Sequence, residues 1–416
     1  MSVNTTGSRW DMFCRIVDNF GDIGICWRLS QQLACEHHLK VRLFIDDFAV
    51  ASKIILGLDH TQSLQTINGV EICGWPADDI DTVDPAGVVV ENFSCGLPSA
   101  YIKHMQTQSA LKNPSSDTIW INLDYLSAEA WVSDFHAKPS LHPSLSLTKH
   151  FFFPGFTTET GGLIREKNLI AAREAFLNSN ALQESFWHKL GVTELEKTPA
   201  ASSTPIKISL FFYPEAQINT LFLALAARSR PVTVILPFNG NITILNDILT
   251  DFKLTIGEVY KKESLTVHLI PFLSQSDYDH LLWACDLNFV RGEDSWIRAI
   301  WAGKPFIWQP YIQTKDTHIT KLKAFLEVYT KDAGSDATED IRAMLFKSNL
   351  LWSGKTETDD IALENNTSQM QHWQQLIKHL PRLKSYAVQR ANSFNAQDDL
   401  ATKLVIFSEN LTKNKV

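Results

Sequence analysis

Short apolar segments rich in β-branched residues alternate with amphipathic segments in two separate stretches of this 416-residue chain. In the first stretch they are Trp10 to Val17, Val41 to Ile45, Val70 to Cys73, Val88 to Asn92, Thr118 to Leu123 and His150 to Phe153. In the second they are Ile206 to Tyr213, Val232 to Phe238, Leu265 to Pro271, Asp286 to Val290 and Phe306 to Gln309. Apolar strands that alternate with helices are typical of parallel sheets covered on both faces. The pattern therefore predicts two Rossmann-like α/β domains.

The chain length agrees with two domains, given the usual size of a single hydrophobic core. Residues 191–205 change to Pro, Ser and Ala without core periodicity, which is typical of a linker. We therefore expect an N-terminal domain at residues 1–190 and a C-terminal domain at residues 206–385. Residues 386–416 are predicted to form a helical tail that packs back towards the first domain. The polar stretch 331–366 is predicted to be a loosely ordered insert.

Composition argues against several classes of protein. Hydrophobic residues make up 44% and charged residues 20%, and no apolar run reaches the roughly 18 residues that a membrane span needs. The N-terminal residues lack the features of a secretory signal, so we expect a cytoplasmic protein. A net charge of −8 argues against general nucleic-acid binding. The six cysteines form no CxxC pair and no zinc-like spacing with histidine, which predicts buried free thiols and no metal site.

One strand-to-helix junction in the second half, from Arg291 to Phe306, predicts an anion site. Large apolar residues recur at helical spacing after a buried strand, until Gly303 and Pro305 end the helix. A helix N-terminus at the carboxyl end of a strand favours a phosphate. Glu293 and Asp294 would repel a diphosphate if they faced it, so they are expected to receive hydroxyls, a base edge or a cation. The alternative is ordinary helix capping by Asp294 and Ser295.

The first strand-to-helix junction carries two acidic residues, Asp18 and Asp22, on either side of Gly21. A helix is expected to begin near Asp22, and the loop lacks the GxGxxG spacing of a dinucleotide fingerprint. Carboxylates at this edge of a sheet can orient or deprotonate a nucleophile. The alternative is that Asp22 caps the helix and Asp18 forms the turn.

Aromatic residues are dense at three strand ends of the second half, within Phe211–Glu215, Pro271–Gln275 and Pro310–Gln313. Such residues can stack on a planar base, although core packing is their commoner role. Together with the Arg291 junction they predict a nucleotide-sugar pocket facing a cleft whose other wall carries Asp18 and Asp22. That arrangement is the GT-B glycosyltransferase fold.

Several motifs occur in an order that closely resembles the EarP family of bacterial protein-arginine rhamnosyltransferases. They are Asp18–Gly24 with Cys26–Leu29, Asn122–Glu129, Phe152–Phe156 and Arg291–Ser295. The resemblance covers nearly the whole chain. It implies a cytoplasmic, inverting enzyme that moves L-rhamnose from dTDP-β-L-rhamnose to an arginine of translation elongation factor P, helping ribosomes through polyproline stretches. It implies no metal and no further cofactor.

The resemblance also assigns roles to residues. Asp22 resembles the family's general base, with Asp18 and Glu293 as further acidic residues needed for turnover. The donor pocket is implied at Phe211, Tyr213, Phe272, Gln275, Arg291, Asp294, Ser295 and Tyr311. The acceptor arginine is expected on the folded N-terminal domain of elongation factor P, in contact with the first domain near Asp18, Asp22 and Asn122–Glu129.

From the residues alone two other readings stay open. One is a nucleotide-sugar epimerase or a glycosyltransferase with a small-molecule acceptor. The other is a non-catalytic protein that binds nucleotide sugars, in which the acidic loop serves only as a helix cap.

Overall fold

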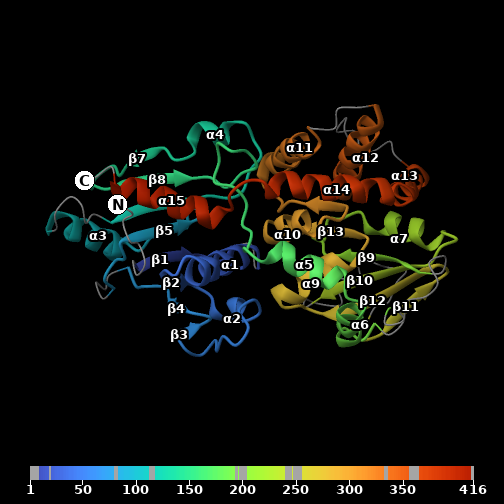
Figure 1. Ribbon diagram of the computed structural model, residues 1–416, viewed down its shortest axis with the longest axis horizontal. Helices are drawn as coiled ribbons and strands as arrows, with labels where there is room; N and C mark the ends of the chain where they lie inside the picture. The colour runs from blue at the N-terminus through green and yellow to red at the C-terminus, as the bar shows by residue number, and fades with distance from the viewer. Residues whose placement is uncertain are drawn as a thin grey trace. The chain divides into compact units, whose positions relative to one another are not determined.

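The computed structural model describes residues 9–17, 20–78, 83–111, 118–192, 195, 204–238, 246, 255–331, 336–355 and 365–413. Its contacts divide the chain into two compact units (Figure 1). The first unit comprises residues 1–167 and 396–416, and the second comprises residues 168–395. Both are α/β, as the alternation of segments predicts.

The first unit holds most of its elements before residue 153. In chain order they are β1 (Arg9–Cys14), α1 (Gly21–Glu36), β2 (Lys40–Ile45), α2 (Phe48–Ala51), β3 (Leu64–Ile67), β4 (Val70–Gly74), β5 (Val88–Asn92), α3 (Ser99–Leu111), β6 (Ile119–Leu123), α4 (Trp131–Phe135), β7 (Pro139–Leu141) and β8 (Thr148–Phe152). The last helix of the chain, α15 (Leu400–Lys413), also belongs to this unit and packs against β6 and α1 (Figure 1).

The first sheet has the order β3-β4-β2-β1-β5-β6-β8-β7. Its six inner strands are parallel, while β3 and β7 pair antiparallel at the two edges. The chain leaves β1 towards β2 on one side and reaches β5 on the other, so the order reverses between β1 and β5. In open α/β sheets ligands bind at this switch point, outside the carboxyl ends of the strands.

Buried polar contacts around Asp11 link the central strands of this sheet. Asp11 in β1 is fully buried, and its carboxylate lies 2.7 and 2.6 Å from the guanidinium nitrogens Nε and Nη2 of Arg42. The same carboxylate accepts hydrogen bonds from the Tyr101 hydroxyl and from the Ala86 backbone N–H. A buried charge that is paired and fully hydrogen-bonded is a structural feature, so we assign Asp11 to the fold.

The second unit starts with two helices and then builds its own sheet. Its elements are α5 (Leu169–Leu177), α6 (Asn180–Lys189), β9 (Ile206–Leu210), α7 (Ile218–Ala226), β10 (Val232–Phe238), β11 (Val259–Lys262), β12 (Leu265–Pro271), α9 (Gln275–Ala284), β13 (Leu287–Arg291), α10 (Asp294–Ala302), β14 (Phe306–Gln309), the 3-10 helix η3 (Thr314–Asp316), α11 (Thr317–Thr330), α12 (Asp336–Trp352), α13 (Asn366–Lys378) and α14 (Leu380–Asn395).

The second sheet has the order β11-β12-β10-β9-β13-β14, and only its edge strand β11 is antiparallel among these described strands. The order reverses between β9 and β13, which gives this sheet a switch point of its own. The two sheets thus share one design, and each offers a ligand-binding edge at the carboxyl ends of its central strands.

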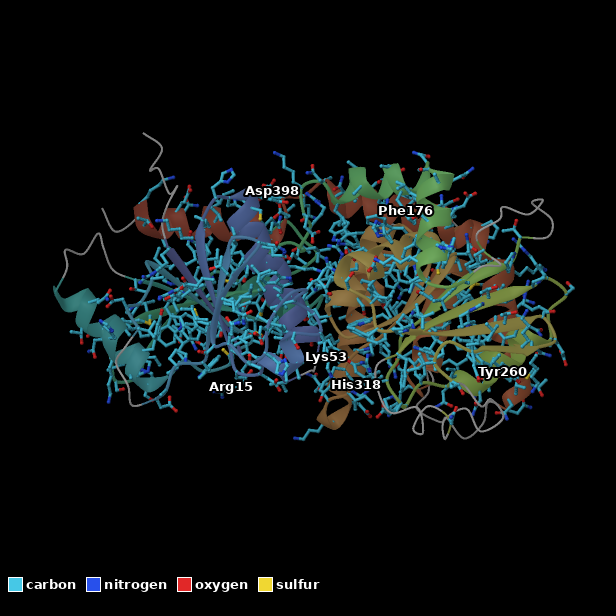
Figure 2. The ribbon with its side chains drawn as sticks, turned by 90° about the horizontal axis from the view of Figure 1, so that it is seen from below. Arg15, Lys53, Phe176, Tyr260, His318 and Asp398 are labelled. Carbon is cyan, nitrogen blue, oxygen red and sulfur yellow. The ribbon has the colours of Figure 1, made fainter. Side chains whose placement is uncertain are left out.

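Two boundaries differ from the sequence expectation. The units divide at residue 168 rather than at 191–205, because α5 and α6 pack within the second unit. Phe176 of α5 (labelled in Figure 2) stacks on His280 of α9 with ring centroids 4.9 Å apart. Most of 191–205 lies outside the described residues. The C-terminal tail also divides, since α14 stays in the second unit and α15 in the first.

The expectation of a loosely ordered insert at 331–366 is wrong for its central part. Residues 336–352 form α12, a helix of 17 residues that packs on β14, α11 and α13. Leu345, Leu350 and Trp352 on this helix are buried. Nine of the 17 residues of α12 are apolar, and most of them lie in the runs 343–346 and 350–352. The polar character of 331–366 comes from the sequence on either side of these runs.

Candidate active site

Asp22 lies at the switch point of the first sheet, where the chain leaves β1 and enters α1. Its side chain is 2% exposed. One carboxylate oxygen accepts the Val17 backbone N–H at 2.8 Å, and the other accepts the hydroxyl of Tyr125 at 3.3 Å. The N-cap of α1 is Phe20, so Asp22 stands inside the first turn and is not the capping residue. The carboxylate is therefore held in place by two hydrogen bonds from outside its helix.

Tyr125 is itself fixed by an unusual turn after β5. Phe93 and Ser94 both adopt positive φ angles, of 58° and 53°, which non-glycine residues rarely do. The turn presents the Phe93 ring to Tyr125, with stacked centroids 4.3 Å apart, and the Ser94 hydroxyl donates to the Asn122 side chain at 3.0 Å. Two consecutive residues in this conformation cost about 1 to 3 kcal/mol each. Such strain at a ligand-binding edge points to a functional reason for holding Tyr125 and Asp22 in place.

Other acidic residues follow neighbouring strands at the same edge. Asp46, after β2, accepts the Ile16 N–H at 3.0 Å, and Asp124, after β6, accepts the Tyr125 N–H at 2.8 Å. Two basic residues are also close by: Arg15 lies over the Trp75 ring at 4.9 Å, and Lys53 lies 6.0 Å from the Phe20 ring centroid (both labelled in Figure 2). Arg15 also lies 3.9 Å from the Asp46 carboxylate, so Asp22 and Asp124 are the carboxylates of this edge that suit a cationic ligand. Asp18 lies outside the described residues.

Arg291 is the centre of the corresponding edge in the second sheet. It ends β13, next to the switch point, and its guanidinium lies over the rings of Phe211 and Tyr213, 4.2 and 4.5 Å from their centroids. It also donates to the Phe212 carbonyl oxygen at 3.1 Å. Cation–π contacts of this kind contribute about 0.5 to 2 kcal/mol. The aromatic residues after β9 therefore hold a cation at the point where a nucleotide diphosphate is expected.

The conformation of the turn between β13 and α10 is held by a glycine and by buried tryptophans. Gly292 adopts a φ of +65°, a value that favours glycine, and its carbonyl accepts the Trp308 indole N–H at 2.7 Å. Trp308 in turn stacks on Trp296 with centroids 3.7 Å apart. This packing sets the direction of α10, whose first backbone N–H groups and positive dipole end favour an anion.

The capping alternative for this junction is not what the structure shows. The N-cap position of α10 is Glu293, whose side chain makes no capping hydrogen bond in the described helix. The hydroxyl of Ser295 instead bonds backward to Arg291, accepting its N–H at 3.1 Å and donating to its carbonyl oxygen. Asp294 accepts a hydrogen bond from Gln275 at 3.2 Å. These side chains are therefore arranged around Arg291 and α9, not around the helix end.

The remaining predicted donor residues lie around the same rings. The ring centroids of Phe272 and Phe211 are 6.3 Å apart, and those of Tyr311 and Tyr213, which meet edge-on, are 5.8 Å apart. Tyr311 is 46% exposed, which leaves much of its ring free for a ligand. It precedes a short loop that leads to His318 at the start of α11 (Figure 2). In α9 and α10, Asp279 and Arg298 form a buried two-point ion pair at 2.8 and 2.6 Å, which fixes the two helices relative to each other.

The structure thus joins six of the predicted donor residues in one set of contacts around Arg291, with the hydrogen-bonded pair Gln275 and Asp294 at the starts of α9 and α10. It places Asp22 in a separate network within the first unit. Sequence reasoning missed two tyrosines. Tyr125 lies in a motif that was recognised, but its bond to Asp22 spans 103 residues and leaves no local signal. Tyr278, on α9, packs on Phe211 with centroids 5.9 Å apart and was not predicted.

Metal and membrane sites are not evident in the part of the chain that the structure describes. Within it, no three His, Cys, Asp or Glu side chains are grouped as metal ligands would be. Of the described helices, none combines the length and the apolar character that crossing a membrane requires.

Comparison with known proteins gives consistent matches. The family model for the elongation factor P (EF-P) rhamnosyltransferase EarP matches residues 10–409. A protein-arginine rhamnosyltransferase of Pseudomonas putida is 40% identical over 96% of this chain and 98% of its own, and one of Pseudomonas aeruginosa is 38% identical with the same coverage. A solved structure described as the basis for EarP-mediated arginine glycosylation of EF-P has 30% identity and a TM-score of 0.61, covering 97% of this chain and 99% of its own. The predicted GT-B glycosyltransferase fold is confirmed.

Proposed function

The chain belongs to the EarP family of elongation factor P rhamnosyltransferases, and from this premise we propose that it transfers L-rhamnose from dTDP-β-L-rhamnose to one arginine of translation elongation factor P. The observation that carries the proposal is the buried carboxylate of Asp22, held by Tyr125 at a ligand-binding edge. EF-P acts on the ribosome, so the reaction is proposed to take place in the cytoplasm and to support translation of polyproline stretches.

The chemistry of arginine explains why a carboxylate is needed. A guanidinium is planar, always charged and a poor nucleophile, because its nitrogen lone pairs are delocalised. In the proposed step an arginine Nη forms a bond to C1 of rhamnose while the bond from C1 to the diphosphate oxygen breaks. The electron pair leaves with dTDP, and the proton lost from Nη passes to Asp22. Asp18 and Glu293 are proposed as further acids that orient the substrates.

The donor end supplies the opposite charge. Negative charge develops on the leaving diphosphate, and Arg291 with the first N–H groups of α10 is proposed to stabilise it, which the position of Arg291 at the start of that helix supports. A single displacement opposite the leaving group inverts the configuration at C1. The thymine base is proposed to stack among Phe211, Tyr213, Phe272 and Tyr311, with Gln275, Asp294 and Ser295 completing the pocket. Since Arg291 meets the diphosphate, no metal ion is required, and a chelator is expected to leave transfer unchanged.

The acceptor is proposed to be a folded domain. A flexible peptide must order its side chains on binding, at about 0.5 to 1.5 kcal/mol for each rotamer-rich side chain, whereas a pre-formed loop does not. Transfer to intact EF-P, to its N-terminal domain and to a linear peptide around the target arginine should be compared. Equal kcat/KM for peptide and domain would contradict this part of the proposal.

The test of the function is incubation with dTDP-β-L-rhamnose and purified EF-P, followed by intact mass measurement. We expect one rhamnosyl group on EF-P, and none on EF-P whose target arginine is replaced by lysine. Consumption of the donor without modification of EF-P would favour an epimerase or a small-molecule acceptor. Donor binding without turnover of any kind would favour a non-catalytic sensor.

A further inference from the structure

The hydroxyl of Tyr278 is buried beside the proposed donor pocket, and the proposed mechanism does not use it. Tyr278 lies on α9, one helical turn after Gln275, and its ring packs on Phe211. Its hydroxyl oxygen is buried and has no hydrogen-bond partner among the described residues. Burial raises the pKa of Tyr278 far above its usual range, so the group is a proton donor at neutral pH. A buried hydroxyl without a partner costs about 1 to 3 kcal/mol and is rare in native proteins.

The surroundings of this hydroxyl indicate what it could serve. Ser295 and the charged groups Asp294, Arg291 and Asp279 all act on the pKa of Tyr278, so they surround its hydroxyl, although Tyr278 and Ser295 do not have hydrogen-bond geometry. Ser295 gives its own proton to the Arg291 carbonyl and accepts the Arg291 N–H. In the ligand-free protein, therefore, the Ser295 hydroxyl beside Tyr278 is hydrogen-bonded to the Arg291 backbone and not to Tyr278.

We propose that Tyr278 is a positioning residue that acts through Ser295 when the donor diphosphate binds. A phosphate oxygen at the start of α10 accepts the Ser295 proton, so the Ser295 O–H turns away from the Arg291 carbonyl. The Ser295 oxygen then accepts a hydrogen bond from Tyr278. Each bond in such a chain polarises the next and strengthens the contact to the anion. This inference rests on the proposed function, since it requires a phosphate-bearing donor in this pocket.

The simpler alternative is that Tyr278 only packs against Phe211, a role that phenylalanine would fill equally well. The two roles differ in three measurable ways: the dependence on phosphate, the dependence on Ser295, and the stability of the ligand-free protein. Removing an unsatisfied buried hydroxyl should not destabilise the ligand-free protein, although it should weaken the bound state.

The experiment is a double-mutant cycle on the full chain with Tyr278→Phe, Ser295→Ala and both together, using calorimetry with dTDP and competition with thymidine. We expect Tyr278→Phe to weaken dTDP binding roughly three- to tenfold, the loss of one hydrogen bond. Thymidine affinity should not change, and the substitution should have no further effect once Ser295 is alanine. The Tm of ligand-free Tyr278→Phe should be equal to or above that of the wild type.

Tyr386→Phe is the matched control, because its hydroxyl donates to the Tyr329 carbonyl at 2.8 Å within the second unit. It should lower the Tm and leave dTDP affinity unchanged. The inference is overturned if Tyr278→Phe leaves dTDP affinity unchanged or weakens thymidine binding by the same factor. It is also overturned if the loss of dTDP affinity in the double variant equals the sum of the losses in the two single variants. If the wild type binds no dTDP, the proposed donor is wrong and this inference falls with it, whereas normal dTDP binding by Tyr278→Phe removes only the inference.

Discussion

The two sheets have the same design but opposite chemistry at their ligand-binding edges. Both are mainly parallel, with an order that reverses next to the first strand of the sheet, between β1 and β5 and between β9 and β13. The first edge carries carboxylates, of which Asp22 is buried and held by Tyr125. The second carries Arg291 over aromatic rings at a helix N-terminus.

Under the proposed function, this difference lets one architecture serve two substrates of opposite charge. The strand order determines where a ligand binds, while the residues that follow each strand determine which ligand it is. An acidic edge suits a guanidinium, and a cationic edge suits a diphosphate. The account therefore divides the proposed reaction between an acceptor edge in the first unit and a donor edge in the second.

The largest expected effect comes from the acceptor edge. Asp22→Asn should lower kcat for rhamnosyl transfer to EF-P by at least about 100-fold, because a lost general base typically costs 10²- to 10⁴-fold. The matched control is Asp46→Asn, an acid of the same edge whose loss should change kcat less than about threefold. Similar losses in both variants would mean that the edge acts through its total charge and not through Asp22.

Substitutions at the donor edge should change the affinity for dTDP. Arg291→Met should weaken dTDP affinity by roughly 2 to 5 kcal/mol, since it leaves a diphosphate charge without its partner. Arg291→Lys keeps the charge but loses the planar group that stacks on Phe211 and Tyr213, so its loss should be intermediate. Calorimetry measures both. If Arg291→Met binds dTDP normally, the diphosphate lies elsewhere and the comparison between the edges fails.

Phe272→Ala separates base stacking from charge at the donor edge. Losing one stacked ring should weaken dTDP and thymidine alike by roughly 1 to 3 kcal/mol and leave pyrophosphate inhibition of transfer unchanged. Phe272→Leu keeps an apolar side chain without an aromatic face, so it should restore only the part of the nucleotide affinity that comes from packing. A fall in Tm with unchanged nucleotide affinity would identify Phe272 as a core residue.

The smallest effect is expected at Tyr125. Tyr125→Phe removes the 3.3 Å hydrogen bond to Asp22 but keeps the stack on Phe93, so kcat should fall about two- to tenfold with the KM for donor unchanged. Tyr101→Phe is the contrasting control. It removes a bond to the buried Asp11 and should lower the Tm while kcat stays the same. The opposite pattern would make Tyr125 a purely structural residue.

The sequence predicted the parallel strands well and missed the antiparallel edge strands. Strands β5, β10, β12 and β14 have the predicted bounds, because buried parallel strands are rich in apolar residues along most of their length. Strands β3, β7 and β11 are short and largely exposed, so they lack an apolar run. They form through pairing with a neighbouring strand, which a local pattern does not reveal.

The candidate site was predictable where its residues follow strands. Asp22, Phe211 and Arg291 lie at the carboxyl ends of strands, as the sequence pattern predicts, while their roles stay predictions. The helix beginning at Asp294 ends at Gly303 with a φ of +61°, as predicted. Tyr125 and Tyr278 were missed because their roles depend on contacts between segments far apart in the chain. Predicting such contacts requires the three-dimensional fold, and periodicity contains no information about them.

The most direct test of the division between the edges is one calorimetric series with dTDP on the wild type, Asp22→Asn and Arg291→Met, with a melting curve for each. The account predicts that Asp22→Asn binds dTDP as tightly as the wild type, while Arg291→Met loses at least about 30-fold, the lower limit for a broken charge pair. All three should remain folded. A loss of dTDP affinity in folded Asp22→Asn comparable to that in Arg291→Met would contradict the account, since the acidic residue would then belong to the donor pocket.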